Sequence, residues 1–330
     1  MFDVITIGSA SRDVFVKSKD FKIFDTPQFK GGKGLAMSLG SKLTVDELHF
    51  EVGGGAVNTA ATFANQGLRV AALAVIGHDL SGEQIIRFLK EKHISTQFVF
   101  KDSNDRTEYS IILSTGKTDR TILRYEGVVW HLHEFQIPWK KFSQTKWFYI
   151  NHLGGEMAKL LGKIISFARE HDIKIAWNPG RTQLQYRKEV IPLLKHADVC
   201  ILNQEEACAL TGISYGESKK IFKRFDDLVH GLVIMTKGPN GVEVSDGKTI
   251  WSAGVLPMKK IVDRTGAGDA FGSAFIASLI KKPDDIEHAI QLASANATGV
   301  LTQWGATNGL LSGKDAIFKW GTLKIKTTML

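Results

Sequence analysis

The sequence predicts an α/β fold: a doubly wound, mostly parallel sheet with helices on both faces, plus a small inserted β-sheet that forms a lid. Three observations support this prediction. Residues 2–8 ("FDVITIG") are a short apolar run closed by glycine, typical of a buried parallel strand. From residue 146 onward, strand-like runs alternate with helical stretches, as in βαβ units. Between these regions lie two groups of short alternating segments, and within each group no helix separates the segments.

The alternating segments cover residues from about 12 to 52, where Gly and Pro interrupt them, and from about 96 to 127. Such a pattern predicts strands of a half-exposed sheet. A sheet with one bare face needs a cover, which it can find over a ligand cleft or against a second subunit. We therefore expect residues 1–330 to form one α/β domain with a β lid in these two pieces.

The other elements follow from apolar periodicity and from helix stop signals. The segment 56–67 reads as a helix that ends at a glycine, and 81–93 as an amphipathic helix. From residue 146 onward we expect strands at 146–151, 173–178, 197–203 and 231–238, with helices between them to about 170, near 189–195 and through 228. A hairpin at 241–252 and helices at 267–281 and from 284 to about 301 should follow.

Composition excludes several classes of protein. The chain has 42 basic and 34 acidic residues, and its net charge of +8 is read as a solvated basic surface. It has no nucleic-acid motif, no apolar run long enough for a membrane span and no signal-peptide pattern. Cys200 and Cys208 fit neither a zinc site nor a disulfide framework. We expect a cytoplasmic protein without nucleic-acid or membrane partners.

The usual phosphate-binding loops do not fit. Gly-Lys-Thr triplets begin at Gly116 and Gly247, but the first glycine that a Walker loop needs is replaced by Ile111 and Val242. The first strand is not followed by the dinucleotide fingerprint. Residues 266–272 ("GAGDAFG") match a loose glycine pattern, which leaves a nicotinamide-dependent oxidoreductase as an alternative.

The same segment carries a carboxylate, Asp269, in the first turn of a predicted helix, directly after Gly266, Ala267 and Gly268. A bound pyrophosphate would be repelled by this charge. A hydroxyl that attacks phosphorus needs a proton acceptor, and the developing phosphoryl charge needs N–H donors. Asp269 is therefore a candidate general base beside an anion hole. The structural alternative is an acid that stabilises the helix dipole by about 0.3–1 kcal/mol.

Two motifs together point to a family. Residues 53–67 ("GGGAVNTAATFANQG") and 263–275 ("DRTGAGDAFGSAF") resemble the two signature regions of the ribokinase-like (PfkB) carbohydrate kinases, in the expected order. The resemblance extends from the first strand to about Ala306. It implies ATP-dependent phosphorylation of a hydroxyl of a sugar or sugar-like substrate, with Mg²⁺, and a homodimer formed through the lid.

The resemblance also implies roles for individual residues. Asp269 matches the catalytic base, and Gly266, Ala267 and Gly268 match the anion hole. On the acceptor side, Asp13 matches a carboxylate that binds sugar hydroxyls. The substrate-side loop and helix start match Gly54, Gly55 and Asn58. The structural alternatives are a solvated turn aspartate and a tight strand-to-helix turn.

On the nucleotide side, the matching positions lie at ends of later strands and on the last helix. They are Asn203, Thr236, Lys237, Gly238, Gly241 and Ser294. Glu206, in "NQEE", matches an acid that acts near Mg²⁺, and contact through water would suffice. Its alternative is a helix-start acid. Asn178 and Arg181, in "WNPGR", are candidate substrate or phosphate contacts, or parts of a structural turn.

Some positions depart from the family pattern. Arg264 stands where a small hydroxyl residue is usual, and no role follows from the sequence. Asp263 and Thr265 are candidate ligands of K⁺, but Gly309 stands where a hydroxyl is expected, which argues against activation by this ion. The adenine-side Asn of close relatives falls on Ser294. Asn296 is two positions further, on another helix face, so the role is not moved to it.

The identity of the acceptor stays open at this point. A nucleoside kinase of the same fold would use the same chemistry, and a catalytically silent sugar or nucleotide binder would keep the same motifs. His152, which follows a predicted core strand, could touch the substrate, although a lone histidine is more often structural.

Overall fold

The computed structural model describes residues 1–330 except 30, 116–119, 181–182, 185–186 and 315–316. Within this part, the main sheet has ten strands in the order β16-β15-β14-β13-β12-β11-β10-β1-β6-β7. The strands from β13 to β7 in this order are parallel, and β14, β15 and β16 add an antiparallel edge. Their bounds are β1 (Phe2–Ile7), β6 (Val70–Gly77), β7 (Ser95–Asp102), β10 (Thr145–Ile150), β11 (Lys174–Trp177), β12 (Val199–Asn203), β13 (Leu232–Thr236), β14 (Val242–Ser245), β15 (Thr249–Ala253) and β16 (Lys326–Met329).

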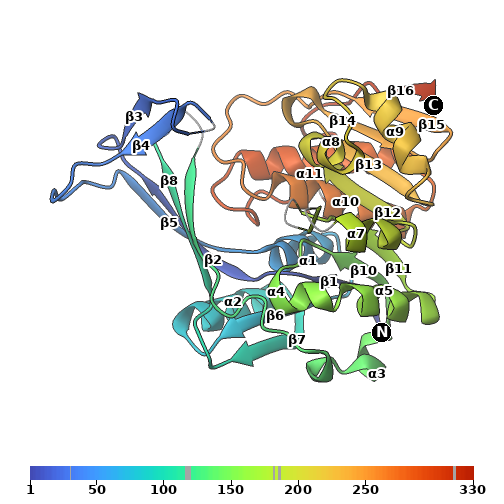
Figure 1. The fold of residues 1–330 in the computed structure, drawn as a ribbon, viewed down its shortest axis with the longest axis horizontal. Coiled ribbons are helices and arrows are strands. Elements are labelled where there is room, and N and C mark those ends of the chain that lie inside the picture. Colours follow the sequence, from blue (N-terminus) through green and yellow to red (C-terminus); the bar gives the residue numbers. More distant parts are fainter. Residues whose placement is uncertain (30, 116–119, 181–182, 185–186, 315–316) are drawn as a thin grey trace.

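Helices cover both faces of this sheet, and each face has its own apolar core (Figure 1). Side chains alternate along β1, so that Ile5 and Ile7 enter one core and Val4 enters the other. One core is covered by α1 (Gly55–Asn65), α2 (Leu80–Glu91), α10 (Ala267–Lys281) and α11 (Ile286–Leu301). The other is covered by α3 (Trp139–Phe142), α4 (Gly155–Lys159), α5 (Leu161–Glu170), α7 (Arg187–Leu194), α8 (Gln204–Thr211) and α9 (Ser218–Asp226). The predicted doubly wound α/β class is confirmed.

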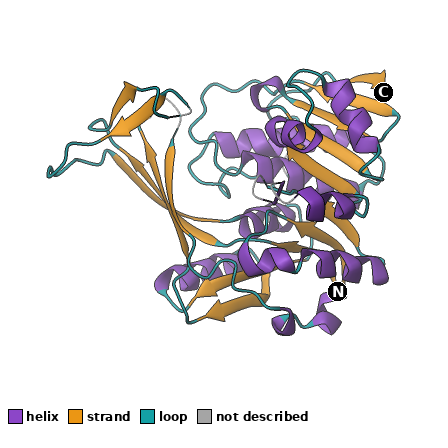
Figure 2. Ribbon diagram, viewed as in Figure 1, coloured by secondary structure: helices purple, strands orange, loops and turns teal. Residues whose placement is uncertain are grey.

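A smaller sheet projects from the helix-covered body (Figure 2). Its order is β5-β2-β8-β9, formed by β2 (Ser11–Lys17), β5 (Glu47–Gly53), β8 (Glu108–Ser114) and β9 (Thr121–Tyr125). Strand β2 pairs antiparallel with β5 and parallel with β8, so the sheet is mixed. A two-stranded hairpin, β3 (Lys22–Asp25) with β4 (Lys33–Ala36), extends from its far end (Figure 1).

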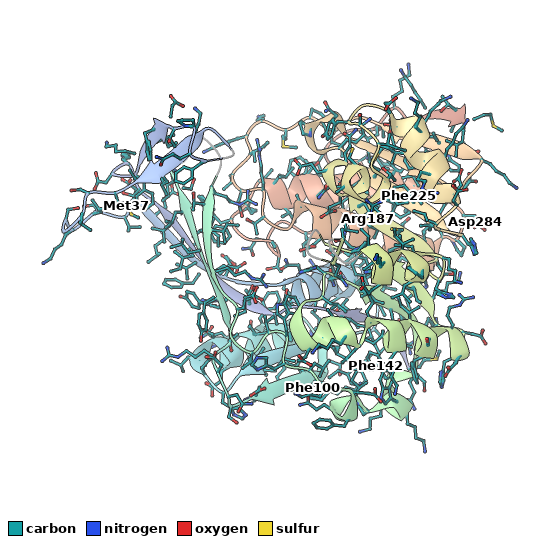
Figure 3. The ribbon with its side chains drawn as sticks, viewed as in Figure 1. Met37, Phe100, Phe142, Arg187, Phe225 and Asp284 are labelled. Atoms are coloured by element: carbon teal, nitrogen blue, oxygen red, sulfur yellow. The ribbon has the colours of Figure 1, made fainter. Side chains whose placement is uncertain are left out.

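One part of the lid prediction is wrong. Residues 95–102 form β7, which pairs in parallel with β6 at the edge of the main sheet and does not join the lid. The physical reason is burial: Phe98 is fully buried, and its ring packs edge-on against Phe142 at 5.4 Å. Figure 3 places Phe100 in the body of the molecule, far from Met37 in the projecting part. The second piece of the small sheet therefore begins at β8.

The order of strands creates a switch point between β1 and β10. The chain continues from β1 to β6 on one side and from β10 to β13 on the other. At the carboxyl ends of these two strands, the backbone N–H of Asn151 donates to the Ile7 carbonyl at 2.9 Å. Parallel α/β sheets bind ligands at such a point. None of the described helices is long and apolar enough to cross a membrane.

Candidate active site

The start of α10 is shaped by two glycines with different requirements. Gly266 precedes the helix with φ +74°, and a Cβ on it would lie 2.2 Å from Cβ of Ala306. Gly268 faces open space, because a Cβ there would meet no atom within 4 Å. In the first turn of a helix, N–H groups have no carbonyl four residues earlier in the helix to bind. Packing explains Gly266, while Gly268 leaves the backbone accessible to a ligand.

Asp269 lies in this first turn and contacts α1. The amide Nδ2 of Asn58 donates a hydrogen bond to Oδ2 of Asp269 at 2.8 Å. Burial raises the pKa of Asp269 to about 6, and the hydrogen bond from Asn58 opposes this rise. The carboxyl group is therefore mostly ionised at neutral pH and able to accept a proton there. Asn58 itself is buried, and its Oδ1 has no hydrogen-bond partner.

Asp13 is also buried, with 7% of its surface exposed. It lies on the same face of β2 as Ser11. Ser11 Oγ donates to Oδ1 of Asp13 at 2.9 Å. A Cβ on Gly53 would lie 2.1 Å from Oδ2 of Asp13, so this glycine makes room for the carboxylate. Burial raises the pKa of Asp13 to about 6. Asp13 is thus a buried carboxylate, which rules out the solvated turn aspartate.

Another acidic side chain, Glu108 of β8, lies in this region and was not predicted from the sequence. It is 4% exposed, forms an ion pair with Arg124 of β9, and has a second carboxylate oxygen, Oε2, without a partner. Burial raises its pKa to about 7, and the Asp13 charge adds to this rise. The pairing of Glu108 with Ser11 across neighbouring strands places it beside Asp13. No motif marks such a residue, because only strand register brings it there.

Gly54 and Gly55 open α1. Gly54 has φ +93°, and a Cβ on it would lie 2.5 Å from the Ser9 carbonyl oxygen. Gly55 is equally crowded, because a Cβ on it would lie 2.9 Å from Cβ of Asn151. Its N–H donates a hydrogen bond to Ser9 Oγ at 3.0 Å. Both glycines are required for a tight turn against the switch point, so the structural interpretation of these positions holds.

A cavity of about 530 Å³ adjoins the start of α10. Four of the positions predicted for nucleotide binding line it, together with Ala267 and Gly268 of the α10 start. The four are Thr236, Gly238, Gly241 and Ser294. Much of the remaining wall is apolar and was not foreseen, namely Val242, Val255, Leu256, Pro257, Met258, Ile261, Phe271, Ala297 and Leu301. Cavities of this size with apolar walls and a few polar groups are typical ligand sites.

Other predicted residues have structural partners and are not among the residues that line this cavity. The Lys237 ammonium contacts Glu243 at 3.0 Å. Asn203 and Glu206 form a capping box at the start of α8: Glu206 N–H donates to Asn203 Oδ1 at 2.8 Å, and Asn203 N–H donates to Glu206 Oε2 at 2.9 Å. Asn178 Nδ2 donates to the Ile201 carbonyl at 3.0 Å. Arg181 lies outside the described residues.

Two further positions have clear surroundings. Asn296 is fully buried and donates to the Ala270 carbonyl at 2.9 Å, whereas Ser294 lines the cavity. His152 packs edge-on against Trp130 at 5.5 Å, and a Cβ on Gly180 would lie 2.7 Å from it. Burial lowers the pKa of His152, which favours its neutral form.

Asp263 and Thr265 lie together just before α10. Thr265 donates to Oδ1 of Asp263 through N–H at 3.1 Å and through Oγ1 at 3.0 Å, while Oδ2 is buried without a partner. Among the described residues, no group of three or more His, Cys, Asp or Glu side chains gathers as a metal cage. Mg²⁺ that phosphates and water mainly hold needs only one protein carboxylate nearby, and Glu206 at the start of α8 is the candidate for it.

Comparison with known proteins assigns the family. Residues 1–312 match the model of the pfkB family carbohydrate kinases. The chain belongs to the pfkB family. It is therefore a phosphotransferase of the carbohydrate-kinase class, and the oxidoreductase interpretation of the glycine pattern is wrong.

Relatives within the pfkB family differ in their acceptors. The chain is 25% identical over 325 residues to a cytidine kinase of Thermococcus kodakarensis, covering 92% of this chain and 98% of the relative. It is equally 25% identical to a ribokinase of Lactococcus lactis, covering 94% of each. A structure of Arabidopsis thaliana ribokinase complexed with ribose and ATP has a TM-score of 0.75 at 16% identity, covering 97% of this chain and 98% of that one. This last likeness shows the fold alone.

Proposed function

We propose that this pfkB-family protein transfers the γ-phosphoryl group of ATP to a hydroxyl of a sugar, a sugar-like compound or a nucleoside. One observation carries the proposal: a single helical turn borders both halves of the site. Ala267 and Gly268 line the apolar cavity, and the next residue, Asp269, contacts Asn58 on the other side. The nucleotide and the acceptor would therefore meet at the start of α10.

The chemistry follows from this arrangement. Asp269 accepts the proton of the acceptor hydroxyl, whose oxygen forms a bond to the γ-phosphorus while the bond from that phosphorus to the bridging oxygen of ADP breaks. The N–H groups of Gly266, Ala267 and Gly268 stabilise the charge on the group in transit. Asn58 orients the base, and a lid closed over the site would exclude water that competes as acceptor.

The remaining predicted residues take supporting roles in this proposal. Asp13 accepts hydrogen bonds from acceptor hydroxyls, and the cavity that Thr236, Gly238, Gly241 and Ser294 line holds the nucleotide. When bound, Mg²⁺ supplies neutralisation of phosphate charge, and Glu206 beside Asn203 would hold it through water. The capping box places this carboxylate at the carboxyl end of β12, the edge at which such sheets bind ligands.

Asp263 and Thr265 are candidate ligands for a monovalent cation. The buried, unpartnered Oδ2 of Asp263 supports this role. Gly309 contributes no side-chain oxygen, and a Cβ there would lie 2.3 Å from the Gly299 carbonyl oxygen, so a hydroxyl residue does not fit in its place. Further ligands from this loop would have to be backbone carbonyls.

The Asp269→Asn substitution tests the general base. It keeps the shape and the Asn58 contact region but cannot accept the proton, so we expect turnover to fall by about 10²–10⁴-fold. Affinity for ADP, measured by calorimetry, should stay close to that of the unmodified protein. Turnover is measured as ADP release with ribose, fructose, ketose phosphates, deoxygluconates and nucleosides as acceptors.

Asp227→Asn, the same chemical change at an exposed position, serves as the matched control and should leave turnover unchanged. Full activity of Asp269→Asn would contradict the base assignment. An unmodified protein that binds ATP but phosphorylates none of these acceptors would favour a silent binder.

A further inference from the structure

The charge of the apolar cavity is concentrated in one side chain. Of the described residues that line it, Arg264 alone is ionisable, and the other members are apolar, glycine or hydroxyl residues. Arg264 stands three positions before Ala267 in the chain, so the cation belongs to the same turn region as the candidate anion hole. An apolar cavity with a single cation fits a ligand with a flat apolar part and an anionic part.

The guanidinium of Arg264 is also available for a ligand. Its side chain is exposed and makes no hydrogen bond or ion pair with any other residue in the part of the chain that the structure describes. Its backbone carbonyl, by contrast, accepts a long hydrogen bond from Ala267 N–H, with N and O 3.5 Å apart, at the start of the turn. The five guanidinium N–H donors therefore have no partner among the described residues.

Lys237, the lysine among the predicted nucleotide contacts, cannot take this role without breaking another contact. Lys237 contacts Glu243 at 3.0 Å and Ser218 Oγ at 3.5 Å, and both partners of this ion pair are largely buried. Removing a lysine from a buried carboxylate leaves an uncompensated charge, which is costly. Lys237 therefore stabilises the β13–β14 connection, and its charge is already neutralised.

We propose that Arg264 binds the phosphate groups of the nucleotide, so that it, and not Lys237, supplies the protein's positive charge to the polyphosphate. The inference rests on the proposed nucleotide site. A planar guanidinium matches two phosphate oxygens at once and holds them beside the N–H groups of the α10 start. Arg264 thereby acts on the phosphates and leaves the nucleobase to the apolar wall.

The test compares two ligands that differ only in phosphate, ADP and adenosine, each measured by calorimetry with Mg²⁺ present. Arg264→Gln should weaken ADP binding by roughly 10-fold or more, since a hydrogen bond to a charged group contributes about 1.5–3 kcal/mol. Adenosine binding should change by less than about twofold, because adenosine lacks the group that Arg264 binds. Arg264→Lys keeps the charge but loses the planar fork, so its ADP affinity should be intermediate.

Lys260→Gln is the matched control, because it removes the same charge from an exposed position of the preceding loop that does not line the cavity. It should leave both affinities unchanged. Equal loss of ADP and adenosine binding in Arg264→Gln would overturn the inference, since that result reports a change of cavity shape. Unchanged ADP binding would overturn it too. An unmodified protein that binds neither ligand would contradict the nucleotide site itself, which separates that failure from the failure of the Arg264 role.

Discussion

At the scale of single residues, the site depends on a balance within one pair. Asn58 and Asp269 are 211 positions apart, and one hydrogen bond of 2.8 Å joins them. Burial raises the pKa of Asp269 to about 6, while the amide donor stabilises the ionised form. A general base with a pKa just below neutral pH is ionised at pH 7 and still basic enough to accept a proton in the transition state.

This balance gives a testable pH dependence. As the proposed general base, Asp269 has to be ionised, so kcat/KM should fall as the pH drops through about 6. Asn58→Ala removes a donor to the ionised form, and the pKa of Asp269 should rise further, moving the acid limb of the profile to higher pH by about one unit. Asn65→Ala, at the end of the same helix, is the control and should keep the limb in place. An unshifted limb in Asn58→Ala would show that the amide does not tune the base.

At the scale of elements, the start of α10 combines a position fixed by packing with one left open for a ligand. Gly266 has a positive φ and lies against Ala306, whereas Gly268 is helical and faces empty space. The two glycines of this motif are therefore needed for different physical reasons.

Substituting each glycine separates these reasons. Gly266→Ala should lower the free energy of unfolding by roughly 1–3 kcal/mol, because its Cβ overlaps Ala306 and its backbone is strained. The free energy of unfolding of Gly268→Ala should lie within about 0.5 kcal/mol of that of the unmodified protein, because the added methyl group enters open space. Its methyl group should nevertheless reduce turnover at least about tenfold by holding the phosphoryl group away from the N–H donors. Thermal unfolding and steady-state kinetics measure the two effects, and a fully active Gly268→Ala protein would contradict the anion hole.

At the scale of the whole molecule, the small sheet presents two different faces. Register places Glu51 and Arg124 on the same face as Asp13, the candidate substrate-binding carboxylate. Phe50, Val14, Ile111 and Leu123 form a row on the opposite face. Phe50 and Leu123 are about half exposed in this row, at 52% and 53%.

This apolar row supports the expectation of a homodimer formed through the lid. Exposed apolar patches of this kind mark protein contacts. The unmodified protein should elute as a dimer in light-scattering chromatography, and Phe50→Glu combined with Leu123→Glu should produce monomers, because burying unpaired charges is costly. Lys22→Glu with Lys33→Glu, on the exposed hairpin, serves as a charge control and should remain dimeric. A monomeric unmodified protein at micromolar concentration would contradict this interface.

The sequence alone determined the fold class, the βαβ order and the helix 267–281, whose bounds the structure reproduces as Ala267–Lys281. These features depend on local periodicity and turn residues, which a single segment carries. Tertiary structure alone decided that Ser95–Asp102 belongs to the main sheet, since an edge strand and a lid strand share one alternating pattern. It also decided that Asn58 contacts Asp269 and that Glu243 pairs with Lys237, because the packing of α1 against α10 and the β13–β14 hairpin bring together residues whose own segments contain no sign of their partners.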